Sequence, residues 1–425
     1  MKLSLSNFGE KLCTKTGILE LMDDLGQAMA SGNPDIIMLG GGNPAAIPAV
    51  QTIWRNRMQE MLQSSPRTFD AMLGNYDPPQ GRPEFVDSIV NLFRQRFGWK
   101  ITKDNVAVTN GSQSGFFCLF NMLAGEFPGG RKKKILLPVI PEYIGYADQG
   151  VTPDLFVAAK PSIEELDRHL FKYKVNFKDL QVTEDIAAIA VSRPTNPTGN
   201  VLTDEELTHL AALAKKHQIP LIVDNAYGLP FPGIVFGSAS LPPWEEHLIY
   251  SFSLSKIGLP GTRTGIFIAA PELVRALAAA NAVISLANGN VGQAIVSGLI
   301  NDGELLRISK EVVQPFYAER VKLAQEAAHE FFDPSLPWRL HKCEGALFFW
   351  LWMKDLPIPS YELYNRLKAR NVIVVPGHYF FYGLNSPWQD SEECLRINYS
   401  RASDAVRAGF EVIGQEMKRA YADAG

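Results

Sequence analysis

Residues 251–263 have the sequence Ser-Phe-Ser-Leu-Ser-Lys-Ile-Gly-Leu-Pro-Gly-Thr-Arg and follow a predicted strand. In this stretch the hydroxyls of Ser253 and Ser255 come just before Lys256, and Arg263 follows the lysine beyond a turn that contains glycine. One loop of this composition can bind an aldehyde and a phosphate together. A lone lysine is nearly always a solvated side chain, because ammonium is strongly hydrated. The role of Lys256 is therefore decided by the motifs around it.

Two motifs upstream of this loop place polar side chains at the ends of predicted strands. Residues 193–199, Arg-Pro-Thr-Asn-Pro-Thr-Gly, form a turn that puts Asn196 at the carboxyl end of one strand, and residues 220–227 end an apolar strand in Asp224 and Tyr227. Ligands of open α/β sheets bind at that edge. Taken singly, Asp224 is more simply a helix cap and Tyr227 a core aromatic. The ordered set of motifs favours a ligand site.

Strand-like and helix-like patterns alternate through the middle of the chain, which is typical of a mainly parallel sheet. We expect short buried strands at residues 105–109, 135–138, 187–192, 220–224, 248–252 and 264–269. Thr203 and Glu206 form a capping box that begins one of the helices between them. After about residue 300 a long helical stretch precedes strands expected at residues 338–341, 346–352, 372–375 and 395–399. This change predicts a second α+β unit, and with no flexible linker between them the two units should enclose a shared cleft.

Composition and charge narrow the class of protein. The chain has 425 residues, of which 46% are apolar and 20% charged, as is typical of a globular protein with two or more structural units. The formal net charge is −4. The basic run at residues 131–134 follows a Pro-Gly-Gly turn, and we interpret it as a solvated turn. Nucleic acid and anionic membrane surfaces are therefore not expected as partners.

The cysteines and the apolar segments indicate where the protein acts. Its four cysteines lack the spacing of metal ligands, so we expect reduced thiols and no metal site. The amino terminus reaches charge and polarity too early for the apolar region of a signal peptide. The most apolar run, residues 346–353, is less than half of the roughly 20 residues needed to cross a bilayer. These features predict a cytoplasmic protein that does not enter the membrane.

The order of the motifs resembles that of the fold-type I, class I/II aminotransferases, which depend on pyridoxal 5′-phosphate (PLP). The shared order is Asn-Pro-x-Gly, Asp-x-x-Tyr, Ser-x-Ser-Lys with a following Arg, and a late Arg, and the resemblance extends through nearly the whole chain. It implies an α/β protein with the aspartate-aminotransferase-like fold, in which a large domain with a mainly parallel central sheet adjoins a smaller α+β domain. The implied limits are residues 1–50 for an N-terminal segment that completes the small domain and the cleft, 51–305 for the large PLP-binding domain, and 306–425 for the small domain.

The same resemblance implies how the cofactor PLP is bound at its ring. Lys256 matches the lysine that binds PLP covalently and moves a proton between the substrate Cα and the cofactor. Asp224 matches the aspartate that pairs with the pyridine nitrogen. Asn196 and Tyr227 match the donors to the phenolate oxygen O3′, and Tyr143 resembles the aromatic residue that stacks on the ring. Lys256, Asp224 and Tyr227 are the predicted catalytic residues.

The phosphate of the cofactor is assigned to a second group of residues. Residues 109–113 lie between a strand and a helical stretch, so backbone amides at the helix start should face the phosphate. The side chains expected to donate to its oxygens are those of Ser112, Gln113, Ser253, Ser255 and Arg263. Tyr76 matches a tyrosine that reaches the phosphate of the neighbouring subunit. The resemblance therefore implies a homodimer with shared active sites.

For the substrate, the resemblance implies an arginine that binds the α-carboxylate. Arg396 lies within an apolar strand, where an arginine is costly unless an anion meets it. Gly42 corresponds to a glycine whose backbone approaches the same carboxylate, and only a missing Cβ is expected to allow that approach. Asn196 is assigned to substrate binding as well.

A narrower resemblance implies the range of substrates. Residues 17–26 and 38–48 resemble the bacterial aminotransferases that act on valine and pyruvate. Relatives specific for dicarboxylates use a second arginine from the stretch that matches residues 281–292, which contains none here. Ile18 and Leu19 are expected to line the side-chain pocket. We therefore expect transfer of an amino group between L-valine, or another small aliphatic L-amino acid, and a 2-oxo acid, pyruvate, by a ping-pong mechanism.

Several other functions remain open from sequence. A PLP-dependent lyase, or an aminotransferase for other apolar or aromatic amino acids, would share the cofactor motifs and differ only in how the substrate is placed. A non-catalytic effector-binding module needs a basic helix-turn-helix segment before the fold, and here the aminotransferase-like pattern begins by about residue 15. A dinucleotide-binding protein needs Gly-x-Gly-x-x-Gly between a strand and a helix, which is absent from the sequence.

Overall fold

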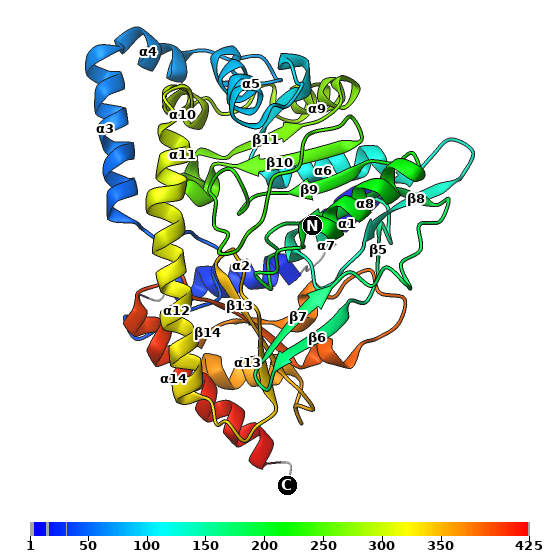
Figure 1. Ribbon diagram of the computed structural model, residues 1–425, viewed down its shortest axis with the longest axis vertical. Coiled ribbons are helices and arrows are strands. Elements are labelled where there is room, and N and C mark those ends of the chain that lie inside the picture. Colours follow the sequence, from blue (N-terminus) through cyan, green and yellow to red (C-terminus); the bar gives the residue numbers. More distant parts are fainter. Residues whose placement is uncertain (1–3, 14–16, 31, 424–425) are drawn as a thin grey trace.

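The computed structural model describes residues 4–13, 17–30 and 32–423. Figure 1 shows two units stacked along the long axis of the molecule, each built around its own sheet. The long helix α12 (Gln314–Phe331) runs along the side of both units. In the described part of the chain, no helix has both the length and the apolar composition that a membrane span requires.

The larger sheet holds the strands expected in the middle of the chain. Its order is β2 (Val106–Asn110), β11 (Thr264–Ile268), β10 (Leu248–Ser253), β9 (Leu221–Asp224), β8 (Ile186–Ser192), β4 (Lys132–Leu137) and β3 (Gly125–Glu126), and β5 (Phe156–Ala158) also pairs with β4. The pairs β9–β10, β8–β9, β4–β8 and β4–β5 are parallel. Strand β11 is antiparallel to both neighbours, and β3 is antiparallel to β4. The predicted mainly parallel sheet of an α/β fold is thus confirmed.

The central strands of this sheet are buried on both faces, as parallel strands usually are. In β9 the side chains of Leu221 and Val223 pack into one hydrophobic core, and that of Ile222 packs into another. Because successive side chains of a strand point to opposite faces, the two cores lie on the two sides of the sheet. The helices that contribute to them are α5 (Pro83–Phe97) and α8 (Asp204–Lys216) on the first side, and α6 (Ser112–Leu123) and α9 (Pro271–Ser285) on the second.

The second sheet forms the smaller unit. Its order is β15 (Val375–Pro376), β16 (Cys394–Asn398), β13 (Phe348–Met353), β12 (Trp338–His341), β7 (Leu170–Lys174) and β6 (Ser162–Asp167). The helices α13 (Ser360–Ala369) and α14 (Ser403–Ala422) belong to this unit. A second α+β unit in the last part of the chain, as the change of pattern near residue 300 predicted, is therefore present.

Two segments from earlier in the chain join the smaller unit. Strand β1 (Ile37–Met38) pairs in parallel with β14 (Val372–Ile373). The hairpin of β6 and β7 lies within the limits expected for the large domain, yet β7 pairs in parallel with β12 of the second sheet. This pairing is between strands distant in sequence, which local patterns do not reveal.

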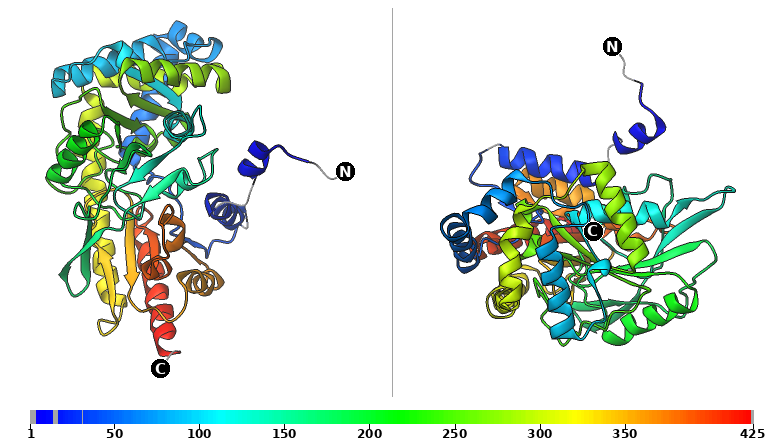
Figure 2. Two further views of the ribbon diagram at one scale, coloured as in Figure 1. Left: turned by 90° about the vertical axis from the view of Figure 1, so that its right-hand side faces the viewer. Right: turned by 90° about the horizontal axis from the view of Figure 1, so that it is seen from above.

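The remaining elements connect and cover these units. The N-terminal helices are α1 (Asn7–Cys13) and α2 (Gly17–Ala30), followed by α3 (Pro48–Ser64) and α4 (Pro66–Gly74). Short or connecting helices are α7 (Ile144–Ala147), α10 (Val291–Asn301) and α11 (Glu304–Ile308). The capping box predicted at the start of α8 is confirmed, because Thr203 and Glu206 hydrogen-bond each other's backbone amides. Figure 2 shows α2 on the outside of the molecule at the level where the two units meet.

Candidate active site

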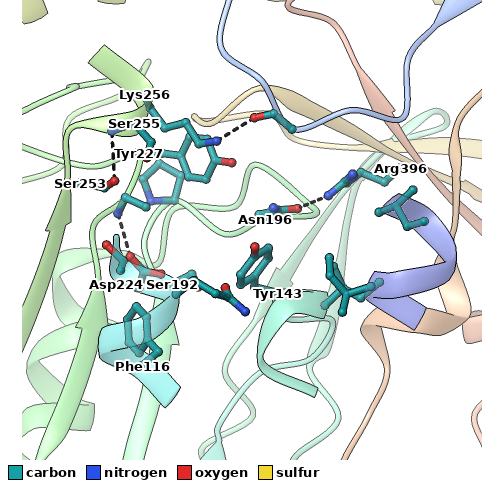
Figure 3. A pocket seen from close by; sticks show the side chains of 18 of the residues that line it. Phe116, Tyr143, Ser192, Asn196, Asp224, Tyr227, Ser253, Ser255, Lys256 and Arg396 are labelled. Atoms are coloured by element: carbon teal, nitrogen blue, oxygen red, sulfur yellow. Dashed lines mark hydrogen bonds between the residues drawn. The ribbon is translucent and has the colours of Figure 1, made fainter. Parts of the chain in front are cut away.

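A cavity of about 220 Å³ lies between the two units, at the carboxyl ends of β8, β9 and β10. Because these strands are parallel neighbours, they end at the same edge of the sheet and bring their following loops together. The predicted site residues that line the cavity are Gly42, Ser112, Gln113, Tyr143, Asn196, Asp224, Tyr227, Ser253, Ser255, Lys256, Arg263 and Arg396. Figure 3 shows several of them directed toward a common space.

Lys256 lies in a 3₁₀ turn (Ser255–Ile257) directly after β10. Its Nζ donates a hydrogen bond of 2.7 Å to the main-chain oxygen of Gly42 and lies 5.4 Å from the centre of the Tyr227 ring. Burial lowers the pKa of Lys256 to about 8, and the positive charges of Arg396 and Arg263 act in the same direction against the attraction of Asp224. A fraction of this amine is therefore unprotonated, and so nucleophilic, near neutral pH.

Asp224 ends strand β9 with a buried carboxylate. The hydroxyl of Tyr146 donates a hydrogen bond to Oδ2, and the backbone amide of Ala226 donates one of 2.9 Å to Oδ1. Burial raises the pKa of Asp224 to about 6, although both hydrogen bonds and the charge of Lys256 favour the ionised form. The site therefore presents a carboxylate that is mostly charged at neutral pH and can pair with a cationic ring nitrogen.

A second buried carboxylate, Glu142, supports the wall of the cavity. It accepts hydrogen bonds from the backbone amide of Tyr143 (2.7 Å) and from both the backbone amide (2.9 Å) and the hydroxyl (2.6 Å) of Ser192. Burial raises the pKa of Glu142 to about 7, against the effect of these hydrogen bonds. Through these hydrogen bonds, Glu142 links the segment that carries Tyr143 with the end of β8.

The sequence did not indicate Glu142 or Tyr146 as parts of the site. Glu142 adjoins a residue that was singled out, but nothing local marks a buried carboxylate beside a proline. Tyr146 comes three residues after Tyr143, a spacing that brings two side chains together on one helical turn, and their rings are 5.1 Å apart in an edge-on arrangement. That spacing was the available signal for Tyr146.

The start of α6 and the loop after Lys256 form an end of the cavity that is suited to an anion. The φ angle of Gly111, which precedes α6, is +85°, and a Cβ atom there would lie 2.1 Å from the guanidinium of Arg263. Only glycine therefore lets this guanidinium approach the first turn of the helix. The free amides of that turn and the charged fork of Arg263 are the donors that a phosphate dianion requires.

Side-chain hydrogen bonds define which groups face an anion at this end. The backbone amide of Ser255 donates a hydrogen bond of 3.1 Å to Oγ of Ser253, so the Ser253 hydroxyl keeps its own proton for donation. The side-chain amide of Gln113 donates a hydrogen bond of 2.7 Å to the main-chain oxygen of Gly145. The side-chain amide of Gln113 is therefore engaged with the main chain here, and its donation to the cofactor phosphate stays a prediction.

Arg396, on β16 of the smaller unit, is 3% exposed. It donates a hydrogen bond of 2.9 Å to Oδ1 of Asn196 across the cleft and one of 2.7 Å to the main-chain oxygen of Gly40. Its guanidinium lies 4.3 Å from the centre of the Phe348 ring, and among the described residues its buried Nε has no hydrogen-bond partner. Burial lowers the pKa of Arg396 to about 10, so it remains cationic at neutral pH. A buried cation with an unsatisfied N–H is suited to an anionic ligand.

The structure changes the interpretation of two residues, Gly42 and Leu19, and leaves the role of Tyr76 toward a neighbouring subunit as a prediction. Tyr76 is 82% exposed and does not line the cavity of its own chain. A Cβ atom at Gly42 would meet no atom within 4 Å, so the protein itself does not demand glycine there. Leu19 is 44% exposed and does not line the cavity, whereas Ile18 does. The neighbouring wall residues from α2 are Leu21 and Met22.

This combination of a lysine with a lowered pKa, a buried carboxylate, an anion-binding helix start and a buried arginine defines a class of protein. The chain belongs to the aminotransferase class I and II family, whose model matches residues 36–412. Enzymes of this family depend on PLP. The fold class predicted from sequence is confirmed by the same match and by similar solved structures, among them the aspartate aminotransferase from Thermus thermophilus, with 19% identity, a TM-score of 0.77 and coverage of 98% of this chain and 100% of that one.

Particular relatives are more similar. The valine–pyruvate aminotransferase of Escherichia coli (strain K12) is 48% identical over 99% of this chain and 100% of that protein. The crystal structure of valine-pyruvate aminotransferase from Salmonella typhimurium LT2 has 47% identity, a TM-score of 0.88 and coverage of 96% of this chain and 100% of that one. A solved structure of a protein from Psychrobacter arcticum 273-4 has 42% identity, a TM-score of 0.95 and coverage of 99% and 100%.

Proposed function

We propose that this aminotransferase transfers the amino group between L-valine, or another small aliphatic L-amino acid, and pyruvate. One observation carries the choice of substrates: a protein named valine–pyruvate aminotransferase is 48% identical along 99% of this chain. The cavity supports the choice with an apolar wall from α2 and the buried cation of Arg396.

The residues around the cavity fit PLP. Lys256 would hold it covalently, Asp224 would pair with its ring nitrogen, and Tyr143 would lie against its ring. Its phenolate oxygen would accept hydrogen bonds from Asn196 and Tyr227. Its phosphate would be held by Ser112, the Gln113 amide, Ser253, Ser255 and Arg263. When bound, PLP withdraws electrons from the substrate Cα and so makes its proton acidic. The missing Cβ of Gly111, which leaves room for Arg263 beside the helix start, supports this fit.

The chain's own residues supply orientation and proton transfer. Arg396 would bind the α-carboxylate of the amino acid, and Figure 3 shows it hydrogen-bonded to Asn196 on the opposite side of the cavity from Lys256. Fixing the carboxylate and the phosphate at separate points sets the direction of the Cα–H bond, which favours loss of the proton over other bonds. The amine of Lys256, with its lowered pKa, is then the group that accepts this proton and returns it.

The charges in the cavity disfavour dicarboxylate substrates. Among the described residues of this chain that line it, the cations are Lys256, Arg263 and Arg396. Lys256 and Arg263 are assigned to the cofactor and Arg396 to the α-carboxylate, so the lining offers no further cation for a side-chain carboxylate. An unpaired carboxylate buried there would be costly. This supports small aliphatic amino acids over aspartate and glutamate.

The proposed reaction is tested by measuring both products of the purified holoenzyme with L-valine and pyruvate. We expect one alanine for each 3-methyl-2-oxobutanoate, no ammonia, and parallel double-reciprocal lines as ping-pong kinetics require. L-aspartate and L-glutamate at the same concentrations should react far more slowly. Release of ammonia without formation of alanine would instead identify a lyase. Faster reaction of aromatic amino acids than of valine would show that the substrates are aromatic and not small aliphatic amino acids.

The lowered pKa of Lys256 predicts how cofactor binding depends on pH. Below a pKa of about 8 the amine is protonated and cannot attack, and above it the amine is free. The second-order rate constant for reconstitution of the apoprotein with PLP should therefore rise about tenfold per pH unit below pH 8 and level off above it. Stopped-flow absorbance between pH 6 and 9.5 measures this profile. A rise that continued to pH 10 would show that the amine has an ordinary lysine pKa.

We also propose that the active unit is a homodimer in which Tyr76 reaches the cofactor phosphate of its partner. Exposed apolar side chains gather on the segments around Tyr76 and at the end of α9, at Leu73, Val283, Ile284 and Leu286. Asn288 and Asn290 donate hydrogen bonds of 2.8 Å to the main-chain oxygens of Pro79 and Asn75, so these segments adjoin. Such a patch is typical of an interface between proteins. Sedimentation measurements should give a mass twice that of one chain. The substitution Ile284→Glu should shift the measured mass toward that of a single chain.

Finally, we propose that the enzyme acts in the cytoplasm. Cys13, Cys118, Cys343 and Cys394 are all free thiols in the structure, which fits a reducing compartment. Activity that fractionates with the periplasm or the membrane would contradict this location.

A further inference from the structure

Helix α2 presents two different faces to the rest of the protein. Ile18, Leu21 and Met22 line the substrate end of the cavity. Glu20 and Asp24, which are four residues apart and therefore neighbours on the helix surface, contact a different set of residues outside the cavity. The helix is thus an apolar wall on one side and an acidic strip on the other.

Glu20 contacts two tyrosines of the smaller unit. One carboxylate oxygen accepts a hydrogen bond of 2.8 Å from the hydroxyl of Tyr379, and the other accepts one of 3.1 Å from the hydroxyl of Tyr361. The ring of Tyr379 also packs on the first residue of the helix, because a Cβ atom at Gly17 would lie 2.5 Å from it. The beginning of α2 is therefore attached to α13 and to the segment Gly377–Phe380.

Asp24 makes the matching contact one turn later. It accepts hydrogen bonds of 2.6 Å from the hydroxyl of Tyr364 and 2.7 Å from Nζ of Lys368, both on α13. Burial would raise the pKa of Asp24, but the hydrogen bonds from Lys368 and Tyr364 outweigh it and lower that pKa. The ionised carboxylate of Asp24 is therefore stabilised where α2 meets α13.

Among the α2 side chains that the structure describes, few are buried by apolar packing. Of the α2 side chains that the structure describes, only that of Leu21 is fully buried, and Met22 is 57% exposed although it lines the cavity. The polar contacts of Glu20 and Asp24 therefore carry a large share of the attachment. All of their four partners lie between residues 361 and 379, in the unit that also carries Arg396.

We propose that Glu20 and Asp24 are positioning residues that attach α2 to the smaller unit and so set the distance between the apolar wall and Arg396. Arg396 would hold the α-carboxylate while the wall meets the side chain of the same substrate. The distance between Arg396 and the apolar wall then decides which aliphatic side chain fits. This inference rests on the proposed function, because it assigns the wall to the side chain of the amino acid.

The inference is tested with the holoenzyme of the double variant Glu20→Ala/Asp24→Ala. Asp23→Ala is the matched control, because Asp23 lies between them on the same helix, is exposed, and makes no hydrogen bond or ion pair with the described residues. Hydrogen exchange of the amides of residues 17–30 reports the attachment without any substrate. The ratio of kcat/KM for L-valine to that for L-alanine reports the fit of the side chain.

We expect exchange in residues 17–30 to become about tenfold faster in the double variant. The preference for valine over alanine should fall about tenfold, mainly through a higher KM for valine, with kcat little changed. The control should match the wild type in both measurements. Tyr379→Phe should act in the same direction, and it should add nothing to Glu20→Ala, because both changes remove the same hydrogen bond.

Each other outcome overturns part of the inference. Unchanged exchange in the double variant would show that the two carboxylates do not hold α2. Faster exchange with an unchanged valine-to-alanine ratio would show that the position of α2 does not select the side chain. A wild type without activity on valine would refute the proposed function, whereas the exchange measurement would still decide whether Glu20 and Asp24 attach the helix.

Discussion

Lys256→Ala will lower turnover of L-valine and pyruvate by at least about 10⁴-fold. The amine of Lys256 has no substitute nearby, because the other cations that line the cavity among the described residues are the guanidinium groups of Arg263 and Arg396. A guanidinium stays protonated and can neither attack an aldehyde nor accept a proton. The measurement is kcat from alanine formation, with circular dichroism to show that the variant is folded.

The fold should survive this change, since the side chain of Lys256 makes few contacts that hold the protein together. Its Nζ donates to one main-chain oxygen, that of Gly42, and its burial costs free energy that alanine would not. Lys178→Ala, at an exposed lysine that does not line the cavity, is the control and should keep full activity. Borohydride reduction of the wild type with PLP should attach the cofactor mass to position 256. Near-normal turnover of the alanine variant would exclude Lys256 as the catalytic amine.

The strands and the loops of the cavity were predictable because their signals are local. The run from Leu248 to Ser253 is apolar and ends in a polar loop, and the same is true of the run from Leu221 to Asp224, so each motif marks its own strand end. Parallel pairing then brings these ends to one edge without any further information. This is why a set of residues scattered between positions 42 and 396 was found together in one cavity.

The features that were missed depend on contacts between distant parts of the chain. The hairpin of β6 and β7 joins the smaller unit through pairing with β12, more than 160 residues later in the sequence. Glu142 is recognisable only once its carboxylate is seen to accept hydrogen bonds from Ser192. Neither relationship leaves a pattern in the neighbouring residues.

The error at Leu19 had a different cause, because a local signal was available. Ile18, Leu21 and Met22 follow the i, i+3, i+4 spacing that places side chains on one face of a helix. Leu19 is rotated away from that face and is 44% exposed. Helical periodicity over residues 17–30 therefore predicts the wall of the cavity, whereas choosing adjacent residues does not.

Arg396→Met will lower kcat/KM for L-valine by about 30-fold to about 5,000-fold, which corresponds to about 2–5 kcal/mol for the loss of one partner of a buried charged hydrogen-bond pair. The methionine keeps the apolar contact with Phe348 but leaves the α-carboxylate without a cation. Arg396 also donates hydrogen bonds to Asn196 across the cleft and to the main-chain oxygen of Gly40, so its removal loosens the binding of the carboxylate at the same time. Initial rates at varied valine and saturating pyruvate measure the effect.

Isobutylamine separates the loss of carboxylate binding from general damage to the site, because it keeps the side chain and the amine of valine and lacks the carboxylate. The wild type should prefer valine strongly in the amino-donor half-reaction, since only valine offers an anion to the unsatisfied Nε and the two other donor groups of Arg396. In Arg396→Met this preference should nearly vanish, because valine then has to bury its carboxylate without a partner. Equal losses of activity toward valine and isobutylamine would mean that Arg396 maintains the shape of the cleft and does not bind the carboxylate.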